Sequence, residues 1–223
     1  MKKLVLSAFV AGILLFSQQT NAQANQTLAS ATSKTTKAGK TVASTTYKLD
    51  PAQSNMAWNG KKVTGEHNGT VKISGGNLLV NQNQVVGGNV VIDMNSLVDL
   101  DITDAEYNQK LIGHLKSDDF FSTEKHPQAT FKINNVTPIK GAKAGAANYN
   151  VNGNLTIKGI TKPVTFPATI NVQGNTITAK SDAVTLDRTQ WDIRYGSKSF
   201  FANIGDKAIH DDFTVKFNLV AKK

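Results

Sequence analysis

Apolar and polar residues alternate with a period of two along much of the chain after residue 46. The clearest runs place apolar residues at every second position of 149–157, 164–172 and 213–219, mostly with Asn, Thr or Lys between them. A period of two puts successive side chains on opposite faces of a β-strand. We therefore expect each of these strands to have one buried face and one face in water.

Short glycine-containing segments separate the alternating runs. Turn signals of this kind are predicted at 74–77, 86–89, 158–159 and 173–175. Their spacing predicts seven to nine antiparallel strands, which is typical of an all-β sandwich or barrel.

One segment between the strands has the period of a helix instead. Thr103 and Glu106 fit a capping box, in which each side chain bonds a free backbone N–H of the first turn. Three apolar residues spaced four apart, from Tyr107 to Leu115, fall on one helical face. Gly113 is predicted to end the helix in the left-handed region. We expect one short amphipathic helix that covers an opening or an edge of the sheet.

The N-terminus has the features of a targeting segment. Two lysines precede an apolar run at 4–16, and small residues then offer cleavage after Ala22 or Ala24. The run is shorter than the roughly 20 residues that span a bilayer, and the chain has no cysteine for a lipid anchor. We therefore expect residues 1–22 to be a signal peptide and the mature protein to be periplasmic or secreted, without stable membrane insertion. The polar outward positions of the strands also argue against an outer-membrane barrel, whose outward band is apolar.

Residues 23–46 consist mainly of Ala, Ser, Thr, Gln and Lys, and we expect a disordered polar spacer before a single domain at 47–223. The formal charge is +9, but five of the positive charges are lysines before residue 47, which leaves +4 for the domain. The remaining lysines are dispersed and are not interleaved with aromatic residues. This pattern does not fit a nucleic-acid-binding surface and indicates no particular oligomeric state.

The sequence does not contain the common motifs of catalytic or metal-binding sites. The sequence lacks a Gly-x-Ser-x-Gly motif, a cysteine and a His-Glu-x-x-His motif, and its four histidines have no metal-like spacing. The acidic residues Asp99, Asp101, Asp104 and Glu106 lack the glycine and distal glutamate of a calcium loop, and helix capping explains two of them. We expect no enzymatic activity, no cofactor and no metal, with a hydrolase kept as an alternative.

Large aromatic residues are the stronger indication of function. The pairs Phe120–Phe121 and Phe200–Phe201 break the alternation, which predicts strands covered on both faces or loops that line something apolar. A barrel of about eight strands can hold one small ligand. An interior left unfilled by side chains would be apolar and suited to a lipid tail. The alternative is a structural or stress-related barrel with a filled core and no ligand.

Several separate motifs follow one another in an order that identifies a family. They are Leu49-Asp50-Pro51, the run from Gly113 to Phe131 with His-Leu-Lys-Ser-Asp-Asp-Phe-Phe, the run from Gly153 to Val164, and Asp187-Arg188. Together they resemble the YceI-like family over nearly all of the mature domain, although Lys158 stands where many relatives have histidine. The resemblance implies an exported, lipocalin-like antiparallel β-barrel that binds or carries a long-chain lipid of the polyisoprenoid kind without catalysis.

A set of candidate ligand-binding residues follows from these considerations. Arg188 is expected near the polar end of the lipid, or alternatively as a structural tie to Asp187 or Asp192. The residues expected to contact the lipid chain are Trp58, Leu115, Phe120, Phe121, Phe131, Phe166 and Trp191.

Overall fold

The computed structural model describes residues 43–223, so the predicted signal peptide and residues 23–42 of the predicted spacer lie outside the described residues. The first strand begins at Thr45, ahead of the domain start expected at residue 47, because Thr45 pairs with Val80 across the sheet. The elements are β1 (Thr45–Leu49), β2 (Asn55–Lys62), β3 (Gly65–Asn81), β4 (Gln84–Asp99), α1 (Ala105–Lys116), β5 (Gln128–Pro138), β6 (Tyr149–Ile157), β7 (Ile160–Gln173), β8 (Thr176–Lys180), β9 (Val184–Asp187), the 3-10 helix η1 (Arg188–Trp191), the 3-10 helix η2 (Gly205–Lys207) and β10 (Ile209–Lys222).

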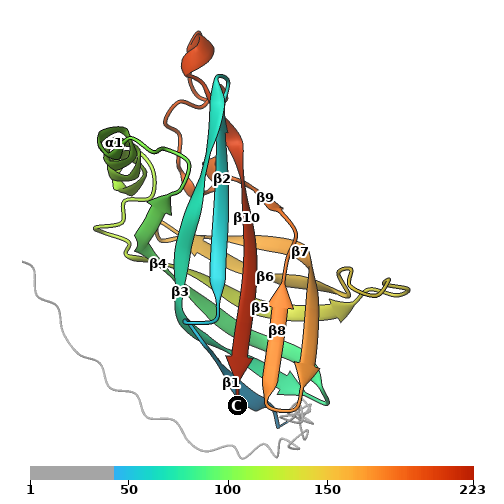
Figure 1. Ribbon diagram of the computed structural model, residues 1–223. Coiled ribbons are helices and arrows are strands. Elements are labelled where there is room, and N and C mark those ends of the chain that lie inside the picture. The colour runs from blue at the N-terminus through green and yellow to red at the C-terminus, as the bar shows by residue number, and fades with distance from the viewer. Residues whose placement is uncertain (1–42) are drawn as a thin grey trace, which may run out of the picture. The chain divides into compact units, whose positions relative to one another are not determined.

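The strands form one antiparallel sheet that closes on itself (Figure 1). Strands β2 to β8 pair in sequence order, and β10 closes the ring by pairing with β2 along its first part and with β8 along its last part. Short β1 and β9 also pair with β10. The all-β, antiparallel barrel with one α-helix is therefore confirmed, with ten strands in the described domain where seven to nine were expected.

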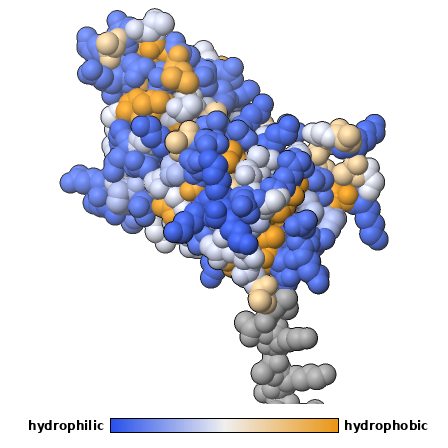
Figure 2. Space-filling view, turned by 60° about the horizontal axis from the view of Figure 1, so that its bottom comes forward, coloured by the Kyte–Doolittle hydropathy of each residue, from blue (hydrophilic) through white to orange (hydrophobic). Residues whose placement is uncertain are grey.

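The period-two pattern predicted that each clear strand has one buried and one more exposed face, and the structure shows that the apolar residues form the buried, inward face. In β6 residues 151, 153, 155 and 157 are buried and alternate with more exposed ones, and in β7 the buried positions are 166, 168 and 170. The outward side chains of these strands are Asn, Thr, Pro and Gln, and the surface viewed in Figure 2 is mostly hydrophilic. The hydrophobic residues thus gather inside the ring.

Two of the four predicted turns are wrong. Segments 74–77 and 86–89 lie within β3 and β4, two strands that pair with each other, and the chain reverses at Gln82–Asn83 instead. The glycines allow the strand to bend at these positions. Gly76 has φ 131°, and a Cβ there would clash with the carbonyl of Asn89. Adjacent shifts in strand register indicate β-bulges, which bend long strands so that the sheet can close.

The other two predicted turns are confirmed. Gly174 and Asn175 join β7 to β8. Lys158 and Gly159 join β6 to β7 with φ 49° and 74°, as a tight hairpin turn with two left-handed residues requires. The Lys158 Nζ then donates to the carbonyls of Asp118 and Asp192, which fixes two loops to this turn.

The helix begins and ends later than predicted. Its N-cap is Asp104 rather than Thr103, because the Asp104 carboxylate accepts the Tyr107 N–H at 2.9 Å. Gly113 lies inside α1, which continues to Lys116. Among residues 43–223, no helix combines the length and the apolar character needed to cross a membrane.

Gly153 allows an inward-facing ring to pack against the backbone of β6. A Cβ at this position would clash with the Phe131 ring and lie 2.5 Å from the Lys132 carbonyl oxygen. We expect Gly153→Ala to lower the free energy of unfolding by about 1–3 kcal/mol through this overpacking, measured by urea denaturation. Gly60→Ala is the matched control, because a Cβ there meets nothing within 4 Å. Equal losses in the two variants would contradict the packing argument.

Candidate ligand-binding cavity

The ring of strands encloses a cavity of about 360 Å³. Its wall is made by inward side chains from strands β2 to β10, together with α1 and the loop that follows it, and it is almost entirely apolar. The volume falls within the range of about 300–1,000 Å³ that is typical of ligand pockets. The interior is therefore not filled by the protein's own side chains, contrary to the filled-core alternative.

A row of three aromatic rings crosses the cavity wall. Phe131 of β5 lies 5.4 Å from Phe166 of β7, and Phe166 lies 5.4 Å from Phe217 of β10, between ring centroids. Each ring is on the inward face of its strand, so the alternation of three distant segments brings them together. Tilted and edge-on contacts of this kind hold the rings in place and leave an apolar surface toward the cavity.

Helix α1 and the loop after it cover part of the cavity. Leu111 and Leu115 lie on the half-buried face of the helix, whereas Tyr107 on the same predicted stripe is exposed. Phe120 and Phe121 follow in a loop whose backbone is held by hydrogen bonds, including Phe121 N–H to the Leu115 carbonyl at 3.1 Å. Four apolar side chains from this segment thus line the cavity, as expected of a helix that covers an opening.

The second Phe-Phe pair was interpreted wrongly. Phe200 and Phe201 are 45% and 48% exposed, and neither lines the cavity. They lie in an irregular segment before β10, where the Arg194 guanidinium stacks 4.6 Å from the Phe200 ring centroid. A pair of adjacent phenylalanines in the sequence does not distinguish these two environments.

Seven of the eight candidate binding residues line the cavity and one does not. Trp191 is 1% exposed and lies in η1, where its Nε1–H donates to the Leu155 carbonyl at 3.1 Å. It packs within the core, so no contact with a ligand in the cavity follows from its position. The residues that do line the cavity are Trp58, Leu115, Phe120, Phe121, Phe131, Phe166 and Arg188.

Arg188 is tied to the backbone of neighbouring segments. Its guanidinium donates to the carbonyls of His210, Ile193 and Ile209 at 3.0, 2.8 and 3.1 Å, and to the Asp211 carboxylate at 3.4 Å. Burial lowers the pKa of Arg188 below its ordinary value, against the opposing charges of Asp211 and Asp187. Most of its hydrogen-bonding capacity is therefore used within the protein.

Arg188 therefore forms a structural ion pair, as the alternative prediction stated, but its partner is Asp211 and not Asp187 or Asp192. Asp187 instead caps η1 by accepting the Thr189 N–H, and Asp192 pairs with Arg194 at 2.6 Å. Asp211 lies 23 residues further along the chain and reaches Arg188 only because β9 pairs with the start of β10.

The polar lining residues gather at one end of the cavity, and sequence reasoning missed most of them. Besides Arg188, they are Lys61, Lys62, His67, His210 and Asp212. Four of these five are solvent-exposed, and they lie at the end of β2 and the beginnings of β3 and β10. These ends meet because Gly60 of β2 pairs with both His67 and Phe213. The lysine pair before the hairpin was the available signal, but only the register shows that it borders the cavity.

Asp211 gives this end of the barrel an acid-sensitive contact. Desolvation raises the pKa of its carboxyl, but hydrogen bonds from Ser197 and Ser199 and the charge of Arg188 outweigh it, so the pKa lies below the ordinary 3.8. The unfolded chain therefore binds a proton here at higher pH than the folded chain, and the stabilisation is lost as pH falls below about 4. We expect Asp211→Asn to reduce the loss of unfolding free energy between about pH 6 and about pH 3, measured by urea denaturation at each pH.

Asp182→Asn serves as the control for this acid effect, since Asp182 is exposed and forms no ion pair within residues 43–223. It should retain the pH dependence of the unmodified protein. An Asp211→Asn curve that runs parallel to that of Asp182→Asn would show that the Asp211 contact is not acid-sensitive.

Comparison with known proteins identifies this architecture. The YceI-like domain family matches residues 47–221. A UPF0312 protein of Yersinia enterocolitica is 45% identical over 62 residues, which are 28% of this chain and 29% of that protein. Protein YceI of Escherichia coli is 42% identical over 62 residues, with the same shares, so these alignments span less than a third of the relatives' length.

Two solved structures share the fold. BcnA of Burkholderia cenocepacia has 28% identity and a TM-score of 0.59, covering 78% of this chain and 99% of that protein. A polyisoprenoid binding domain from Saccharophagus degradans has 17% identity and a TM-score of 0.54. The match covers 79% of this chain and 97% of that domain.

Proposed function

This chain belongs to the YceI-like family, and on that premise we propose that it binds or carries one long-chain lipid, of the polyisoprenoid class, inside its barrel. The lipid is held without chemical change. Its tail occupies the apolar cavity, and its polar end lies toward the polar lining residues at the end of β2 and the start of β10.

The observation that carries this proposal is the contrast between the wall of the cavity and its polar end. The wall consists of aliphatic and aromatic side chains, and the polar lining residues are confined to one end. Each methylene group moved from water into such a wall contributes about 0.8 kcal/mol, so a chain of several isoprene units binds without specific hydrogen bonds. The name of the Saccharophagus domain supports the same ligand class.

Binding without catalysis is part of the proposal. The contacts of Arg188 support this part. Arg188 lines the cavity, but its guanidinium donates to three backbone carbonyls and to Asp211 rather than presenting free donors to a reacting group. The chain also contains no cysteine and no Gly-x-Ser-x-Gly motif.

We also propose that the protein acts outside the cytoplasm. The support is the sequence of residues 1–22, with its two lysines, apolar run and small-residue cleavage points. Intact-mass measurement of the protein recovered from its native cells should give a chain beginning at Gln23 or Asn25, found in the periplasmic or extracellular fraction. A cytoplasmic chain that retains Met1 would contradict this.

The lipid itself is tested on protein purified from native cells without detergent. Solvent extraction and mass spectrometry should recover close to one long-chain lipid per protein chain, with masses that follow a C5 series. The emptied protein should then take up a fluorescent polyprenyl alcohol, and competition with a saturated fatty acid should be weaker than with unlabelled polyprenol. Absence of bound lipid together with absence of polyprenol uptake would overturn the proposal.

A further inference from the structure

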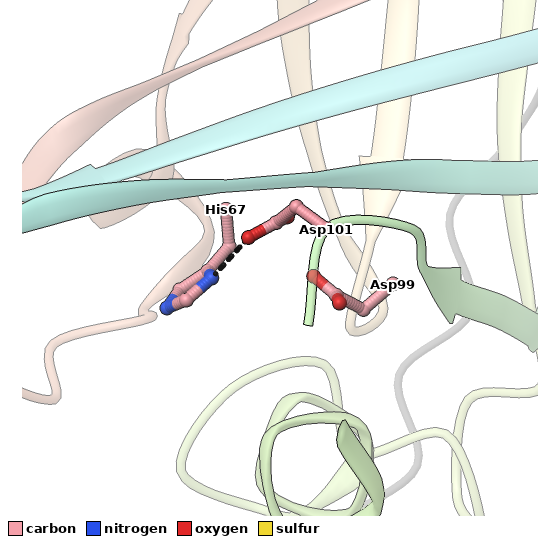
Figure 3. Close-up of side chains that lie close together, drawn as sticks. All are labelled: His67, Asp99 and Asp101. Atoms are coloured by element: carbon pink, nitrogen blue, oxygen red, sulfur yellow. Dashed lines mark hydrogen bonds and ion pairs between the residues drawn. The ribbon is translucent and has the colours of Figure 1, made fainter. Parts of the chain in front are cut away.

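Three side chains of metal-ligand type converge beside the polar end of the cavity. His67 comes from β3, Asp99 is the last residue of β4, and Asp101 follows it after one residue (Figure 3). One ligand atom of each lies within 4.8 Å of those of the other two. The strand register produces this cluster, because the start of β3 pairs with the end of β4.

The Asp99 carboxylate is buried with one oxygen unused. Asp99 is 6% exposed, and its Oδ1 accepts the Ile102 N–H at 2.8 Å and the Asn108 side-chain amide at 3.2 Å. Its Oδ2 is buried and has no hydrogen-bond partner within residues 43–223. Buried polar atoms are nearly always satisfied, and an unpaired one costs about 1–3 kcal/mol, more where the group is charged. A cation held at Oδ2 would remove this cost.

The other two ligands are already held in position by the backbone and by each other. Asp101 Oδ1 accepts the Asn68 N–H at 2.6 Å, and its Oδ2 lies 2.9 Å from the His67 Nδ1. His67 and Asp101 are both partly open to solvent, so an ion can reach them. Within the described chain, neither aspartate forms an ion pair with a lysine or arginine.

We propose that His67, Asp99 and Asp101 form a binding site for one divalent transition-metal ion, with Zn²⁺ as the best fit. Two carboxylates balance the charge of the ion, and the imidazole nitrogen favours zinc over calcium or magnesium, which prefer oxygen ligands alone. Three protein ligands leave a fourth coordination position for water or another ligand. The site does not depend on the lipid, since its residues need no ligand in the cavity to bind the ion.

The sequence did not reveal this site because its acidic residues, compared as a local group with a calcium loop, do not fit one. Of the four acidic residues considered together, Asp104 caps α1 and Glu106 pairs with Lys110 on the helix surface at 2.6 Å. The remaining two, Asp99 and Asp101, form the proposed site together with His67, which lies 34 residues before Asp101. No local spacing rule joins these positions.

Zinc binding is tested by titrating the chelator-treated full chain, made without a histidine tag, and following the heat of binding and competition with a chromogenic zinc indicator. We expect one Zn²⁺ per chain, with Ca²⁺ and Mg²⁺ failing to displace it at equal concentration. Asp101→Asn and His67→Ala should each weaken Zn²⁺ binding by more than about tenfold. Asp99→Asn should do the same, and circular dichroism of each variant checks that it is folded.

The chain offers a matched control in a second histidine–aspartate pair. His114 Nε2 lies 3.2 Å from Asp119 Oδ2, but within the described residues this pair belongs to no three-ligand cluster. His114→Ala should leave zinc affinity and stoichiometry unchanged. The proposal is overturned if zinc binding is absent, or if His67→Ala and His114→Ala weaken it equally. An NMR signal of the His67 ring that does not shift with Zn²⁺ would overturn it as well, independently of any variant's folding.

Discussion

Replacing Ala168 with phenylalanine should abolish most lipid binding while leaving the barrel folded. Ala168 is buried on the inward face of β7 and lines the cavity beside Phe166. A phenyl ring there occupies space that the ligand would use, and displacing about three methylene groups removes about 2–3 kcal/mol of transfer free energy. Polyprenol affinity should therefore fall by about 30- to 150-fold, measured by fluorescence titration with the labelled alcohol.

Thr169→Phe is the control for this variant, because Thr169 is the next residue of β7, is half-buried on the outward face and does not line the cavity. It adds an aromatic ring to the same strand without entering the cavity, and its lipid affinity should match that of the unmodified protein. Urea denaturation of both variants separates loss of binding from loss of folding. Full lipid affinity in a folded Ala168→Phe protein would contradict a ligand site inside the barrel.

Replacing Arg188 with methionine should lower the free energy of unfolding more than any of the other substitutions. The side chain is 5% exposed, and its removal takes the Arg188 donors from three backbone carbonyls and the cationic partner from the Asp211 carboxylate. Breaking a buried, hydrogen-bonded charge pair on one side typically costs about 3–5 kcal/mol. We expect a loss of that size in the free energy of unfolding, followed by tryptophan fluorescence in urea.

Arg194→Met provides the comparison on the same segment. Arg194 pairs with Asp192 at 2.6 Å, but both side chains are more than half exposed, and such surface pairs contribute about 0–1 kcal/mol. A loss below about 1 kcal/mol in Arg188→Met would contradict the structural role. If that variant were stable but lost lipid affinity, Arg188 would instead act at the polar end of the ligand.

The cavity wall was predictable because period-two alternation is a local property. Phe131 and Phe166 each lie at an alternating apolar position, and both face the interior once the strands close into a ring. The motifs from Gly113 to Val164 are likewise contiguous in sequence. They identify the family without information on which strands pair.

Turn positions and side-chain partners were less predictable. The glycines at 75–76 and 87–88 marked bends within long strands, since a glycine permits a turn and a kink equally well. Trp191 was expected to contact the lipid as one of the large aromatic residues, yet η1 turns it into the core against β6.

By itself the sequence determined that the chain forms an antiparallel barrel and that each of its clear strands has one apolar and one polar face. Only the tertiary structure decided that the interior is hollow and that its polar residues gather at one end. It also decided that Arg188 meets Asp211 and that His67 joins Asp99 and Asp101. The physical reason is the range of the interactions. Side-chain direction follows from neighbouring residues, whereas register and ring closure join residues far apart in the chain, and no local pattern encodes that pairing.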